Sequence, residues 1–157
     1  VGLALLARLL LGDSTRQALQ RWVPAALRRL LREAPLAKTM RTISAWGQAL
    51  LADPKADSGA ENSLRYGGFG SAATLRDAAT LLLALVAHVQ PRLLERCCPS
   101  STVAALAEGL CTRMIGRGGS GPNVQMMACE VFAISFGLWR RHLASALPRR
   151  QPQGATS

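Results

Sequence analysis

Apolar residues recur along most of the chain at spacings of three and four, with polar residues between them, as in helices that bury one face. Breaks rich in Gly, Pro, Asp and Ser separate these stretches. Ala and Leu are abundant and β-branched residues are sparse, which favours helices over strands. The pattern predicts an all-α protein of about six helices, at Gly2–Leu11, Thr15–Arg32, Leu36–Ala52, Thr74–Gln90, Thr102–Ile115 and Asn123–Ala146.

Two prolines affect these predicted helices. Pro24 lies inside the second helix, and we expect it to kink or restart that helix because proline removes a backbone donor. Pro91 follows the fourth helix, and Arg92–Cys98 is expected to continue the helix beyond a kink.

The last predicted helix is apolar on two stripes. One stripe consists of Met127, Val131, Ile134 and Leu138, and the other of Ala128, Phe132, Ser135 and Trp139. A helix with two apolar stripes is expected to lie between neighbouring helices rather than on the surface.

The chain is expected to form one helical domain over residues 1–147. A long irregular loop is predicted at about 53–71, and residues 148–157 are polar and basic, as in a disordered tail. The longest apolar run, Ala78–Val89, is shorter than the roughly 20 residues of a membrane-spanning helix. We therefore predict no transmembrane segment.

The segment from Trp22 to Asp53 contains two helical stretches joined by a short break. Val23–Leu31 opens with Val-Pro and continues with Leu at helical spacing, and Thr42–Leu50 is rich in Ala and Leu. This hairpin resembles an armadillo or HEAT repeat, and Val103–Leu106 with Asn123–Glu130 resembles a second copy. The resemblance implies hairpins stacked as an irregular solenoid segment, which typically binds partners and does not catalyse reactions. A compact helical bundle is the alternative, because such hairpins occur in many all-α folds.

The net charge is +10, and it is concentrated at the two ends of the chain. Residues 1–50 hold eight basic and two acidic residues, and residues 111–157 hold six basic and one acidic residue. Arg21, Arg28 and Arg32 recur at spacings of seven and four, so they share one face of the second helix. This face is interpreted either as a solvated surface or as an anion-binding surface. The candidate binding residues are Arg21, Arg28, Arg29, Arg32, Lys38, Arg41, Arg140 and Arg141.

The charge predicts an anionic partner. We expect a protein-interaction scaffold whose basic helical groove binds an acidic or phosphorylated segment of another protein. The alternative is a helical assembly factor that binds the phosphate backbone of RNA or DNA. No aromatic residues are interleaved with the basic cluster Arg140, Arg141, Arg149 and Arg150, so stacking on single-stranded bases is not indicated.

Residues suited to catalysis or to metal binding are scarce. His88 is expected to lie in the apolar face of the fourth helix, and His142 lies near a helix end beside two arginines. The four cysteines lie in apolar or helical contexts without a CxxC motif, which favours free buried thiols in a reducing compartment. We therefore expect an intracellular protein of the cytoplasm or nucleus, with no enzymatic activity, no cofactor and no metal site.

Overall fold

The computed structural model describes residues 2–11, 16–33, 35–51, 69, 71–116 and 121–140, with the side chains of 16–21 outside this description. All regular structure in the described part is helical, which confirms the all-α prediction. The bounds of the helices are α1 (Gly2–Leu11), α2 (Arg16–Glu33), α3 (Leu36–Leu51), α4 (Ala72–Val89), α5 (Pro91–Cys97), α6 (Ser100–Met114) and α7 (Pro122–Ile134). A short helical stretch, 136–140, follows α7. The described part thus holds more helices than the six expected.

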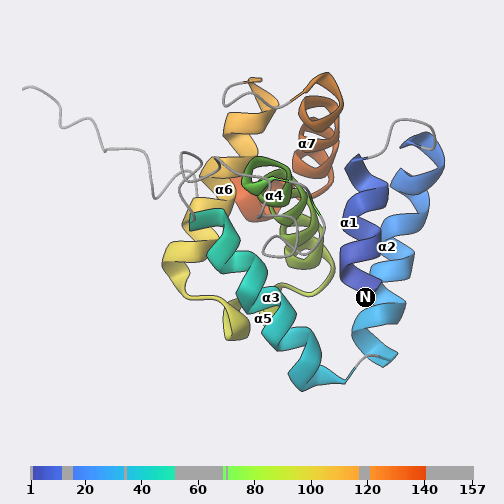
Figure 1. The fold of residues 1–157 in the computed structure, drawn as a ribbon, viewed down its shortest axis with the longest axis vertical. Helices are drawn as coiled ribbons and strands as arrows, with labels where there is room; N and C mark the ends of the chain where they lie inside the picture. The colour runs from blue at the N-terminus through green and yellow to red at the C-terminus, as the bar shows by residue number, and fades with distance from the viewer. Residues whose placement is uncertain are drawn as a thin grey trace, which may run out of the picture.

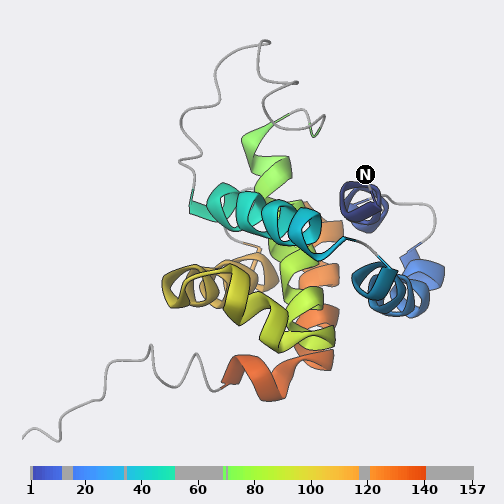
Figure 2. The same ribbon diagram turned by 90° about the horizontal axis from the view of Figure 1, so that it is seen from below.

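Helix α4 lies at the centre of the molecule and contacts each of the other six helices (Figures 1 and 2). Ser71 caps its first turn, since the Ser71 hydroxyl oxygen accepts a hydrogen bond from the Thr74 backbone N–H at 3.1 Å. Every residue from 78 to 87 is buried. By length and composition this helix could cross a membrane, and most of it is buried here by the surrounding helices.

The fourth predicted helix is divided into α4 and α5. Gln90 leaves the helical conformation, with φ −144° and ψ 70°, and Pro91 begins α5. Proline suits the first position of a helix, where its missing N–H costs no hydrogen bond. His88 is exposed near the end of α4, so its expected place in the apolar core is wrong. By contrast, α2 continues as one helix through Pro24.

The last predicted helix ends earlier than expected, at Ile134. The Ser135 hydroxyl donates a hydrogen bond to the carbonyl of Val131, one turn back. Such a bond gives the backbone an alternative to regular helix, and Ser135 forms a turn before the chain resumes at 136–140. The predictions for residues 141–146, for the tail at 148–157 and for most of the loop at 53–71 lie outside the described residues.

Phe69, just before α4, joins α1 to α3. Its ring packs edge-on against that of Trp46 with 5.5 Å between the centroids. The Arg8 guanidinium of α1 lies over the Phe69 ring, 5.4 Å from the ring centroid. Aromatic and cation–π contacts of this kind each contribute roughly 0.5–1.5 kcal/mol. They hold the start of the central helix between the two flanking helices.

Gly47 allows α3 to pack closely against α6. A Cβ at this position would lie 3.0 Å from Thr102 Cγ2 and 3.3 Å from Cys98 Sγ. We expect Gly47→Leu to lower the free energy of unfolding by about 1–3 kcal/mol, because the added atoms overpack a buried contact. Gly137→Leu is the matched control, since nothing lies within 4 Å of a Cβ there. Urea denaturation of both variants checks the prediction, and equal midpoints would contradict it.

Candidate functional site

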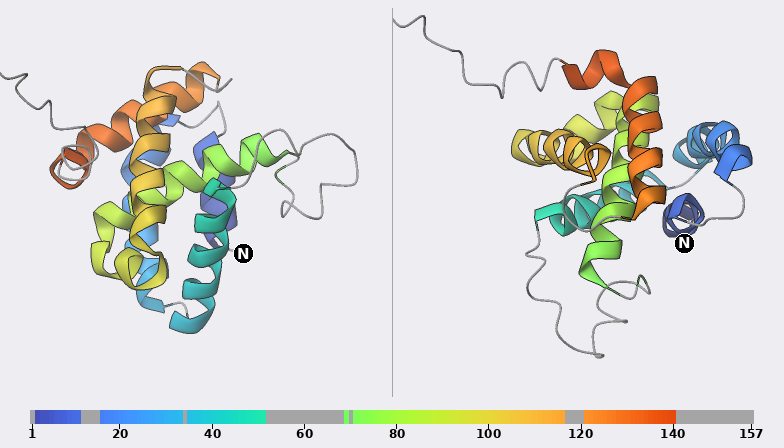
Figure 3. Two further views of the ribbon diagram at one scale, coloured as in Figure 1. Left: turned by 90° about the vertical axis from the view of Figure 1, so that its left-hand side faces the viewer. Right: turned by 90° about the horizontal axis from the view of Figure 1, so that it is seen from above.

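Basic residues gather where α2 ends and α3 begins. Only residues 34 and 35 separate these helices, so the last turns of α2 lie next to the first turns of α3 (Figures 1 and 3). The turn is held by the Lys38 backbone N–H, which donates to the Pro35 carbonyl at 3.0 Å. We call this group the basic end, and all of its members are exposed: Arg28, Arg29, Arg32, Lys38 and Arg41.

One member of the basic end is paired within its own helix. Arg29 Nε lies 2.9 Å from Glu33 Oε1, and both side chains are largely exposed, at 80% and 63%. Such a pair stabilises a helix by only about 0.3–0.5 kcal/mol. The other four members form no ion pair with any residue in the described ranges. Their charges are therefore presented to solvent.

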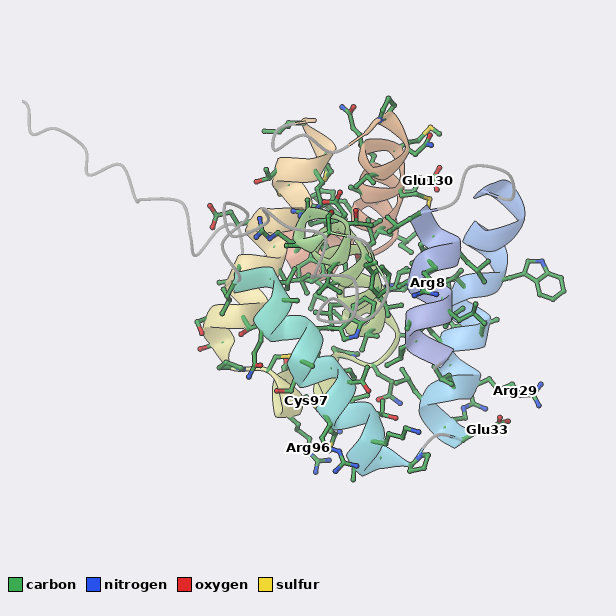
Figure 4. The ribbon with its side chains drawn as sticks, in the orientation of Figure 1. Arg8, Arg29, Glu33, Arg96, Cys97 and Glu130 are labelled. Carbon is green, nitrogen blue, oxygen red and sulfur yellow. The ribbon has the colours of Figure 1, made fainter. Side chains whose placement is uncertain are left out.

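Helix α5 adds basic residues that the sequence analysis did not single out. Helix α5 contacts α3, and Figure 4 shows Arg96 at the same end of the molecule as Arg29, beside the first turns of α3. Arg92 precedes Arg96 by four residues, so the two share a face of α5, and both are exposed. The four-residue spacing was visible in the sequence, but the packing of α5 against α3 was not.

A hollow of about 570 Å³ opens beside the basic end, between the beginning of α1 and the α2–α3 connection. It is lined by Gly2, Leu3, Leu30, Pro35, Lys38, Thr39 and Thr42. The Thr39 hydroxyl donates to the Pro35 carbonyl at 3.3 Å, and the Thr42 hydroxyl donates to the Lys38 carbonyl at 3.0 Å. The hollow therefore offers an apolar wall with a lysine ammonium at its edge.

Among the remaining predicted binding residues, the structure describes the side chain of Arg140 alone. Arg140 is exposed, but the stretch 136–140 lies away from the α2–α3 connection (Figures 2 and 3). Arg21 belongs to α2, and its side chain lies outside the described part, as does the whole of Arg141.

One pair of ionisable residues lies inside the molecule. Arg113 of α6 and Asp77 of α4 make a buried ion pair with 2.7 Å between Nε and Oδ1. Among the described residues, no group of three or more His, Cys, Asp or Glu side chains could hold a metal ion.

The four cysteines are free thiols. Cys98 is buried and Cys129 is exposed, so the expectation of burial fails for Cys129. Burial raises the pKa of the Cys98 thiol, and the neighbouring Cys97 raises it further. Burial also raises the pKa of Cys97, against the opposing charge of Arg96. A raised pKa disfavours the thiolate, so these two side chains lack the environment of a reactive cysteine.

Comparison of the chain with family models, curated proteins and solved structures finds no match. The function is therefore inferred from the residues of this chain.

Proposed function

We propose that the protein is a non-enzymatic interaction module whose basic end binds an acidic or phosphorylated segment of another protein. The observation that carries this proposal is the exposed group of cations that α2 and α3 present together. Arginine suits the role because its planar guanidinium can bind a carboxylate or a phosphate through two parallel hydrogen bonds.

The geometry of the basic end supports rapid and selective encounter with an anion. Its residues lie at the ends of two helices packed on one core, so their backbone positions are held before binding. Preorganisation reduces the entropy lost on association. Like-signed charges on one surface also steer an oppositely charged partner and repel a cationic one. Binding through such contacts is expected to weaken as salt rises.

Two arrangements of the module are considered, a stack of armadillo- or HEAT-like hairpins and a compact bundle. We favour the compact bundle because α4 contacts every other helix. In a stack of repeats, each unit would contact only its neighbours. In the bundle the partner is bound by an outer face of α2 and α3, and not by the concave side of a superhelix.

Charge reversal at Arg32 tests the proposal. We expect Arg32→Glu to weaken binding of a fluorescein-labelled oligoglutamate peptide roughly fivefold, because each exposed charge contact is worth up to about 1 kcal/mol. Arg140→Glu is the matched control, since it changes the net charge equally but lies away from the basic end. Fluorescence anisotropy at two salt concentrations measures both variants.

The outcomes separate the two partner classes. Equal weakening by Arg32→Glu and Arg140→Glu would show that net charge, and not the basic end, determines binding. A labelled RNA that binds more tightly than the peptide, with a steep salt dependence for every sequence, would favour a nucleic-acid partner instead.

A further inference from the structure

An apolar groove of about 330 Å³ lies between α1, α2, α4 and α7. It is lined by Leu10, Val23, Pro24, Leu85, Met127, Glu130, Val131 and Ile134. Leu85 of the central helix is 3% exposed, and Val131 and Met127 are each 2% exposed, so the floor is part of the core. In Figure 1, α4 and α7 lie to the left of α1 and α2, and these four helices supply the lining residues of the groove.

On α7, one exposed apolar residue lies a turn before Glu130 and another a turn after it. Met126, Glu130 and Ile134 follow one another at spacings of four, so they form one stripe on α7. Met126 is 45% exposed and Ile134 is 50% exposed. Exposed apolar side chains that adjoin a groove mark a surface that gains from being covered.

Glu130 is the charged residue of the groove. It forms no ion pair with any residue that the structure describes. Figure 4 shows it on the side of α7 that faces the end of α1. A carboxylate at this place opposes the approach of another anion, and it therefore restricts where an acidic partner can put its charges.

The wall formed by α2 leads from the groove to the basic end. Pro24 lines the groove, and Arg28 and Arg32 follow it at spacings of four on the same side of the helix. Successive turns of a helix are 5.4 Å apart, so these side chains follow one another over about two turns. One bound segment can therefore contact both the groove and the arginines.

We propose that the groove binds the apolar face of an amphipathic helix in the partner protein, with acidic residues at one end of that helix lying against Arg28 and Arg32. This inference rests on the proposed function and names the kind of segment that the basic end recognises. The acidic residues lie toward the α2 side, away from Glu130. The charge favours an acidic partner over a second copy of this chain, because two copies each carrying +10 repel one another.

A helix fits the groove better than an extended strand does. Recognition of a strand requires the free backbone donors and acceptors of a sheet edge, and the walls here are helices whose backbone groups bond internally. A bound helix instead places apolar side chains at spacings of three and four into a groove between helices.

Selection from a display library of random peptides tests the inference with the full chain as bait. We expect enriched peptides to carry apolar residues at helical spacing and acidic residues toward one end. Ile134→Glu is expected to reduce their binding at least tenfold, because it places a second carboxylate on the groove. Ile134 is half-exposed, so the fold should tolerate the change. Ile115→Glu is the matched control, since Ile115 is 62% exposed and does not line the groove.

Three results would overturn the inference. The enriched peptides could be acidic but lack apolar residues at helical spacing, and their binding could be unaffected by Ile134→Glu. The proposed function would then stand, but the groove would have no part in binding. Enrichment of apolar peptides that Arg32→Glu does not weaken would overturn the proposed function as well. Self-association that is abolished by Ile134→Glu, measured by light scattering, would assign the groove to a second copy.

Discussion

Trp139→Ala is expected to lower the free energy of unfolding by about 3–5 kcal/mol, the range for removing a buried tryptophan. Trp139 is fully buried and is the largest of the fully buried side chains in the described part of the chain. Its indole Nε1–H donates to Ser135 Oγ at 2.5 Å. The substitution removes the ring from the core and leaves a cavity that the surrounding helices can fill only in part.

Trp139→Phe separates the contribution of packing from that of the hydrogen bond. Phenylalanine keeps an aromatic ring in the core and removes the indole N–H, so we expect it to cost less than half as much as alanine. Urea denaturation followed by circular dichroism measures both variants. Phe136→Ala is the control, because Phe136 is an exposed aromatic residue of the same stretch. If Trp139→Ala cost no more than Phe136→Ala, residues 136–140 would not belong to the core.

The first three helices could be predicted from the sequence because their signals are local. Val23 and Leu27 are buried at a spacing of four on α2, and Ile43 and Gly47 repeat this spacing on α3. Gly12 and Pro35 are helix-ending residues in the sequence, and the predicted bounds agree with the structure to within one residue. Local periodicity and helix-ending residues are sufficient in such segments.

The arrangement of the helices could not be predicted in the same way. The near-continuous apolar sequence of α4 indicated burial, but not that a single helix would contact all the others. His88 lies among apolar residues in the sequence and is exposed in the structure, because α4 leaves the core near its end. Periodicity alone does not show where a helix emerges from its neighbours.

Only those residues of the candidate site that are close together in the sequence could be predicted. The cations of α2 and α3 are close in the sequence, and the short turn between the helices brings them together. Arg96 joins them only through the packing of α5 against α3. The groove is assembled from four helices between Leu10 and Ile134, so no sequence window contains it.

The buried pair of Arg113 and Asp77 is a further tertiary feature, and it carries the second large prediction. The two residues are 36 positions apart and join α6 to α4. Their side chains are 8% and 15% exposed. Arg113 Nη1 also donates to the Gly109 carbonyl at 2.9 Å, so the guanidinium is held at two of its donors. Burial lowers the pKa of Arg113, and the Asp77 carboxylate acts to raise it.

Removing either partner alone is expected to cost about 3–5 kcal/mol, because a buried charge then loses its counter-charge. Arg113→Met keeps an apolar stem of similar length and removes the cation from beside Asp77. Asp77→Leu removes the anion from beside Arg113. The double variant Arg113→Met/Asp77→Leu is expected to be far more stable than the sum of the two losses predicts, since two apolar side chains can replace a buried pair.

A double-mutant cycle measured by urea denaturation checks this expectation. A matched cycle uses Arg29→Met and Glu33→Leu. That pair also joins one arginine to one carboxylate, but both side chains are exposed. Its coupling energy is expected to stay below about 0.5 kcal/mol. A coupling between Arg113 and Asp77 no larger than this would mean that water screens the pair. A large coupling would mean that the buried pair stabilises the packing of α6 against α4.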